Sequence, residues 1–113
     1  MTSVQPAAAV RGKTIRLTWT EGPTKGQTYE HVFHPDGTVE WYDPKAGKKT
    51  GTAKERPKYG AAKVADDIYV VSYLAPSGFT LTVVLNFRDH KMAGFASGAK
   101  EWYPLQGTFE VVK

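Results

Sequence analysis

Tyr29 and His31 are the residues whose types and spacing are best suited to proton transfer in this chain. They are two positions apart, so on a β-strand both side chains point to the same face. An imidazole among aromatic rings can act as a general base near neutral pH, and a tyrosine hydroxyl can hold or release the proton. Core histidines more often only make a hydrogen bond, so a catalytic role is the second interpretation of this pair.

Metal and cofactor motifs are not supported by the spacing of the other chemical groups. His31 and His34 form an H-x-x-H pair, but residues three apart on a strand face opposite sides and cannot grip one metal ion. Gly12-Lys13-Thr14 is similar to the end of a phosphate-binding loop, yet Ala7 stands where the first glycine belongs. The chain has no cysteine, which excludes a thiolate nucleophile. We expect neither a metal site nor a cofactor.

Strands are expected to position these residues. Turn signals such as Gly22-Pro23, Pro35-Asp36-Gly37 and Pro76-Ser77-Gly78 separate short runs rich in β-branched and aromatic residues. No window has a helical period, and 97–104 is expected to be irregular. The pattern predicts an all-β fold with strands at 13–20, 27–34, 38–43, 50–56, 60–65, 67–74, 79–87, 91–97 and 106–112, where 50–56 and 60–65 are either two strands or one broken strand.

Alternation along these strands predicts an inner apolar face and an outer polar face. About eight antiparallel strands with such faces are expected to close into one up-and-down β-barrel, whose interior is either a filled core or a cavity for one small ligand. The inward residues expected to bind such a ligand are Leu17, Trp19, Tyr29, His31, Trp41, Tyr73 and Phe87.

Length and composition indicate one globular domain of 113 residues, 41% of them hydrophobic. We expect residues 1–10 to be a flexible leader and 11–113 to form the barrel domain. The first ten residues lack the basic and apolar regions of a signal peptide, and no stretch approaches the ~20 apolar residues of a membrane span. A cytoplasmic protein without a membrane partner is therefore expected.

Several segments together resemble a known group of proteins. Gly12-Lys13-Thr14 through Trp19, then 36–41, 68–73 and 83–87, are similar to the bacterial phenolic acid decarboxylase and MoaF-like group of calycins. The resemblance covers nearly the whole chain from Arg11 onward. It implies a calycin, lipocalin-like barrel.

The resemblance does not extend to the decarboxylase site. Those enzymes hold the substrate carboxylate with two tyrosines on the first strand, and an arginine and a glutamate complete the site. Here the tyrosine positions fall on Leu17 and Trp19, the glutamate position on Ala75, and the arginine position near Thr52. Only Tyr29 matches a residue of that pocket. The resemblance therefore implies the MoaF-like branch and no decarboxylation of phenolic acids.

Three functions remain open on the sequence. The first is a barrel that binds one small apolar or aromatic ligand. The alternative is an enzyme that uses the same pocket as a lyase, isomerase or cyclase on an aromatic or polyketide-like metabolite, with His31 or Tyr29 moving a proton.

The resemblance and the outward apolar residues Tyr42, Val84 and Val112 also predict a homodimer.

The third function is single-stranded nucleic-acid binding through a Lys-rich stretch. The net charge is +4, and seven of the fifteen basic residues lie close together, with Tyr42, Tyr59 and Trp102 as exposed aromatic candidates. Because most aromatic residues alternate inward, away from this stretch, we expect nucleic acid to be an unlikely partner. The basic residues concerned are Lys45, Lys48, Lys49, Lys54, Arg56, Lys58 and Lys63.

Overall fold

The computed structural model describes residues 9–22, 24–45 and 56–112, which form eight β-strands and no helix. This confirms the all-β prediction. The strands are β1 (Thr14–Glu21), β2 (Thr28–Phe33), β3 (Val39–Tyr42), β4 (Tyr59–Ala65), β5 (Ile68–Leu74), β6 (Thr80–Asn86), β7 (Lys91–Ser97) and β8 (Trp102–Val111). These ranges therefore contain no helix long and apolar enough to span a membrane.

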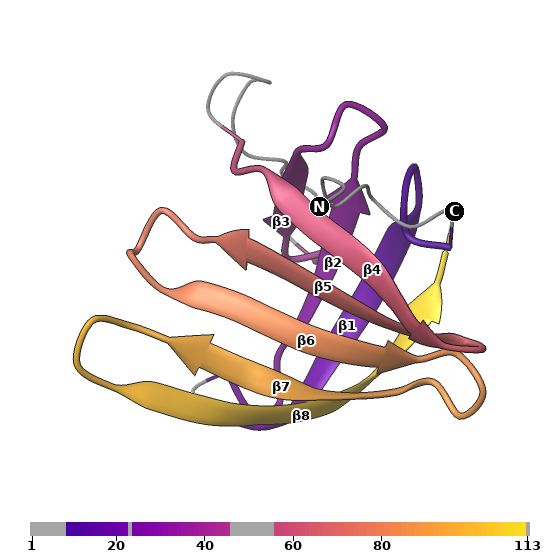
Figure 1. The fold of residues 1–113 in the computed structure, drawn as a ribbon. Helices are drawn as coiled ribbons and strands as arrows, with labels where there is room; N and C mark the ends of the chain where they lie inside the picture. The colour runs from indigo at the N-terminus through magenta and orange to yellow at the C-terminus, as the bar shows by residue number, and fades with distance from the viewer. Residues whose placement is uncertain (1–8, 23, 46–55, 113) are drawn as a thin grey trace.

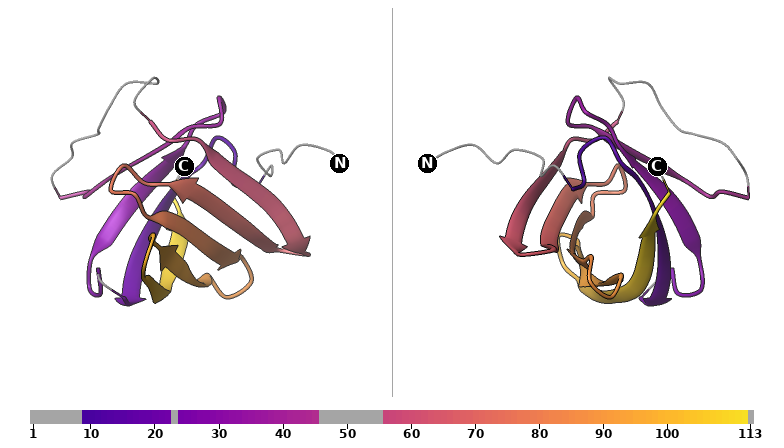
Figure 2. Two further views of the ribbon diagram at one scale, coloured as in Figure 1. Left: turned by 60° about the vertical axis from the view of Figure 1, so that its left-hand side comes forward. Right: turned by 90° about the vertical axis from the view of Figure 1, so that its right-hand side faces the viewer.

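All eight strands belong to one antiparallel sheet in the order β3-β2-β1-β8-β7-β6-β5-β4. Strands adjacent in sequence are adjacent in the sheet, apart from β3 and β4, and the first strand pairs with the last. The sheet curls so that β4, β5 and β6 face β1, β2 and β3 across an interior (Figures 1 and 2). This is the up-and-down arrangement expected from the turn spacing.

The two edge strands, β3 and β4, meet at one short stretch. Thr38 and Lys58 form an isolated antiparallel bridge, with backbone bonds from Val39 N–H to the Pro57 carbonyl (2.9 Å) and from Tyr59 N–H to the Gly37 carbonyl (3.0 Å). The curled sheet is therefore a barrel that its backbone joins at one end of the seam.

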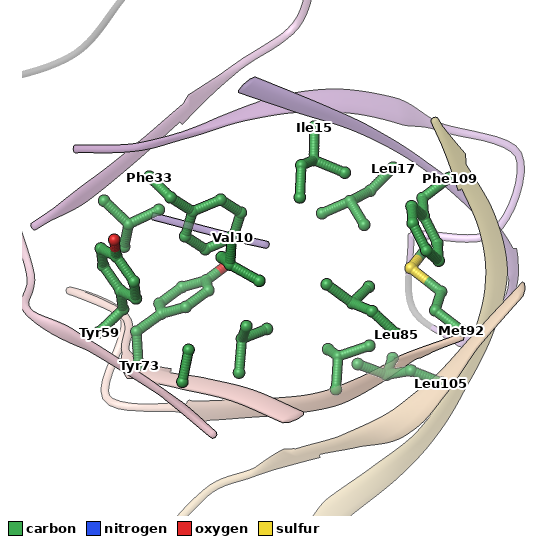
Figure 3. Packing of buried hydrophobic residues seen from close by; sticks show 14 of the residues in the cluster. Val10, Ile15, Leu17, Phe33, Tyr59, Tyr73, Leu85, Met92, Leu105 and Phe109 are labelled. Atoms are coloured by element: carbon green, nitrogen blue, oxygen red, sulfur yellow. The ribbon is translucent and has the colours of Figure 1, made fainter. Parts of the chain in front are cut away.

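The interior is an apolar core built from the alternate residues of every strand. In β1 the burial pattern alternates, and Ile15, Leu17 and Trp19 are buried. Figure 3 shows side chains from opposite walls pointing toward one another, including Phe33, Leu85 and Phe109. Val10 is also fully buried in this cluster, so the core begins one residue before the predicted domain start, while residues 1–8 of the predicted leader lie outside the described ranges.

The largest difference from the predicted strand bounds is at the last strand. β8 begins at Trp102 rather than at 106, because residues 102–106 pair with β7, including Phe95 with Pro104. Proline is tolerated there because β1 pairs with β8 only from Gln106 onward, so Pro104 lies on an edge. β4 is one strand from Tyr59, and most of the predicted strand 50–56 lies outside the described residues.

Two inward glycines allow the strong curl of β7 and β8. A Cβ on Gly94 would overlap the carbonyl oxygen of Thr82, and one on Gly107 would overlap that of Thr18. Neighbouring strands approach closely at both points, which only a residue without a side chain permits.

Candidate functional site

A cavity of about 1090 Å³ occupies one end of the barrel. Its rim comes from the connection after β1, the connection between β5 and β6, and the first residues of β8. Five of the lining residues at this end are small and leave space between the larger ones: Gly22, Thr24, Ala75, Ser77 and, on β7, Ala96. The opposite end of the barrel is filled by the apolar core.

His31 and Tyr73 form the polar part of the cavity wall. His31 Nε2 lies 2.9 Å from the Tyr73 hydroxyl, and both side chains are buried. The contact joins β2 to β5 across the interior, over 42 residues of sequence. It therefore links the two walls of the barrel near its seam.

Aromatic rings surround this pair. Trp41 is the cross-strand partner of His31, and their rings stack with centroids 5.8 Å apart. The rings of Trp41 and Tyr73 lie 5.0 Å apart, which connects β3 to β5 without passing through β4. Phe33 stacks on His31 with centroids 6.0 Å apart. The imidazole is thus held between two aromatic rings.

Burial sets the protonation of this pair. Desolvation lowers the pKa of His31 to about 3, and the Tyr29 backbone opposes that change only in part. Burial also raises the pKa of the Tyr73 hydroxyl far above its ordinary value. Both side chains are therefore uncharged at neutral pH, and the bond between them is a neutral hydrogen bond.

Tyr29 also lines the cavity, but its hydroxyl is used differently from the prediction. It donates a hydrogen bond to the side-chain oxygen of Gln27, in an exposed position. The register pairs Tyr29 with Leu17 on β1, whereas Trp41 pairs with His31. Tyr73 is therefore the hydroxyl that contacts the imidazole.

Five of the seven predicted ligand residues line the cavity: Trp19, Tyr29, His31, Trp41 and Tyr73. Leu17 and Phe87 do not line it. Leu17 is buried in the core one inward position beyond Trp19. Phe87 follows the far end of β6 and packs edge-on against Phe109 at 5.0 Å. Both face inward as expected, but they lie in the filled end of the barrel.

Sequence reasoning missed several lining residues. Phe79 and Tyr103 stack at the rim with ring centroids 6.0 Å apart. Phe79 and Leu81 are two positions apart and both line the cavity. The two-residue period of a strand places both side chains on the inner face, so this period could have identified Phe79 as a lining residue. Tyr103 was hidden by the expectation that 97–104 is irregular.

Charged groups are scarce at the cavity. Glu21, an exposed residue at the rim, is the one charged side chain among the described lining residues. His34 lies outside the cavity, 3.2 Å from Glu40. In the parts of the chain that the structure describes, no three His, Asp or Glu side chains gather as metal ligands would.

The fold and cavity define a small β-barrel with an aromatic-lined interior. The chain belongs to the MoaF family, because its residues 2–101 match the model of the MoaF N-terminal domain. This confirms the resemblance found in the sequence. No curated protein sequence matches the chain.

Several solved structures have a similar fold. One of them is a crystal structure described as a "putative beta-lactamase" from Burkholderia vietnamiensis, with a TM-score of 0.71 and 18% sequence identity. The match covers 96% of this chain and 99% of that chain. At this identity the similarity establishes the shared fold alone.

Proposed function

We propose that this protein binds one small apolar or aromatic molecule inside its barrel. The observation that carries the proposal is the cavity of about 1090 Å³, whose wall combines Trp19, Trp41 and Tyr73 with one neutral polar pair. Ligand sites are typically concave, mostly apolar and fitted with a few polar groups that orient the ligand. A filled core, the competing expectation from the sequence, would leave no such space.

The enzyme alternative finds weaker support in the same residues. The contact between His31 and Tyr73 places a proton acceptor beside a hydroxyl in the cavity wall. An efficient general base has a pKa near the working pH, whereas that of His31 is about 3. Burial also makes Tyr73 a weaker acid. Tyr29, the other candidate, has its hydroxyl turned to Gln27. These features favour orientation of a ligand over proton transfer.

Nucleic-acid binding is also less well supported. Arg56 lies 3.5 Å from Asp36, and Lys63 lies 3.3 Å from Asp66, so these cations already have anionic neighbours. Tyr59, expected as an exposed stacking residue, is buried in the core. Lys48, Lys49 and Lys54 lie outside the described residues.

The test compares two substitutions on one strand. Ala96 lines the cavity, whereas Ala93 is exposed on the outer face of β7. We expect Ala96→Trp to weaken ligand binding at least tenfold by filling the space, while Ala93→Trp leaves it unchanged. Native mass spectrometry of protein purified from its own host would supply the ligand, and titration calorimetry would measure its affinity. Equal affinity in both variants would show that the ligand binds elsewhere.

A further inference from the structure

We propose that the cavity selects uncharged aromatic ligands and rejects those with a carboxylate. The inference rests on the proposed function and adds the charge class of the ligand. It follows from the charges along the wall, the uncharged state of the His31–Tyr73 pair and the distribution of the aromatic rings.

The described wall offers an anion no opposite charge. Neither lysine nor arginine occurs among the described lining residues, and Glu21 places a negative charge at the rim. A carboxylate entering the barrel would lose its hydration without gaining an ion pair, and it would pass a like charge on the way. A neutral molecule of the same shape avoids both costs.

The polar pair does not supply the missing positive charge. His31 is stacked between Phe33 and Trp41, so rings rather than water surround its imidazole. Burial lowers the pKa of His31 to about 3, so the imidazole is uncharged at pH 7. No acidic side chain among the described residues makes an ion pair with His31 that would favour the charged form. The pair can therefore make a neutral hydrogen bond to a ligand, but it supplies no positive charge to pair with a carboxylate.

The rings favour a flat, apolar body. Trp41 and Tyr73 form one close pair in the wall, and Phe79 and Tyr103 form a second at the rim. Aromatic faces and edges of this kind pack well against another ring. A ligand that combines six-membered or fused rings with an uncharged polar group therefore matches this wall.

The experiment uses two probes with the same ring system, 2-naphthamide and 2-naphthoate, which are nearly equal in shape and differ in charge. Binding to the full chain is measured at pH 7 by quenching of tryptophan fluorescence, because Trp19 and Trp41 line the cavity. We expect 2-naphthamide to bind at least tenfold more tightly than 2-naphthoate. Equal or tighter binding of 2-naphthoate would overturn the inference while leaving the proposed function intact.

Two variants locate the effect. Glu21→Lys should narrow the difference between the probes, because it replaces the repelling charge at the rim with an attracting one. Asp66→Lys makes the same change of net charge on an exposed turn between β4 and β5, and it should leave the difference unchanged. If both variants shift the ratio equally, the selectivity reflects overall charge and the inference fails. If neither probe binds the parent chain, both the inference and binding of simple aromatic molecules are refuted.

Discussion

Replacing His31 by glutamine should remove an acid-dependent loss of stability. In the unfolded chain a histidine has a pKa near 6.5, whereas burial lowers the folded value to about 3. Between these values the unfolded chain binds one proton that the folded chain excludes, so stability falls as the pH falls through this window. Above pH 6.5 this contribution is constant. His31→Gln keeps a polar group for the Tyr73 hydroxyl and removes the titrating site.

The size of the effect follows from the two pKa values. One excluded proton changes the free energy of unfolding by about 1.4 kcal/mol per pH unit, so about 2–3 kcal/mol is lost between pH 6.5 and 4.5. Carboxyl groups of the unfolded chain also begin to take up protons toward pH 4.5, whereas in the folded chain hydrogen bonds from Thr38 lower the pKa of Asp36 and keep it ionised. Only the difference between parent and variant therefore isolates His31.

Urea denaturation at pH 7 and pH 4.5 measures this difference. We expect the cost of His31→Gln to shrink by about 2–3 kcal/mol at the lower pH, or to change sign. Ile15→Val is the control, because it removes one methyl group from the same core and no titrating group. It should lower the free energy of unfolding by about 1 kcal/mol, equally at both pH values. An equal change in the free energy of unfolding between pH 7 and pH 4.5 for the parent and for His31→Gln would refute the conclusion that His31 is buried and neutral.

Three further predictions concern the fold, the assembly and the chemistry. Gly94→Ala should lower the free energy of unfolding by about 3 kcal/mol, because the new Cβ would meet the backbone of Thr82. Gly26→Ala is the control: it lies at an open turn with a positive φ, and it should lower the free energy of unfolding by about 1 kcal/mol. Chemical denaturation of both variants measures the difference. The outer face of β6–β8 exposes Val84 (38%), Phe95 (49%) and Trp102 (63%), so light scattering should give about twice the 12.5 kDa monomer mass, and a monomer mass at all working concentrations would contradict the dimer. Ferulate and coumarate should not be decarboxylated, since Leu17, Trp19 and Ala75 stand where that reaction needs tyrosines and a carboxylate; vinylphenol formation above background would overturn this interpretation.

The faces of the strands could be predicted from the sequence because they depend on local alternation. The period of two places Trp19, His31 and Trp41 on the inner face, whatever the rest of the chain does. The short turn between β2 and β3 also sets their register, which brings His31 opposite Trp41. These relations involve residues close in sequence, and the structure agrees with them.

Contacts across the barrel could not be predicted in this way. His31 meets Tyr73 because the sheet curls until β2 and β5 approach each other, and that curl depends on close strand contacts at Gly94 and Gly107. Nothing in the sequence near either residue specifies the meeting. Val10 likewise joins the core only because the barrel brings other strands to it, although its neighbours Ala7, Ala8 and Ala9 read as a leader.

The depth of the cavity is the property that alternation leaves undetermined. Leu17 and Trp19 share one face of β1, about 7 Å apart along the strand, yet only Trp19 lines the cavity. The boundary between them is set by side-chain volume contributed from other strands. Large residues such as Phe33 and Phe109 fill the far end, whereas Gly22, Ala75, Ser77 and Ala96 leave the near end open. Residue size must therefore be compared at equal height around the whole barrel, and that comparison requires the register of all eight strands.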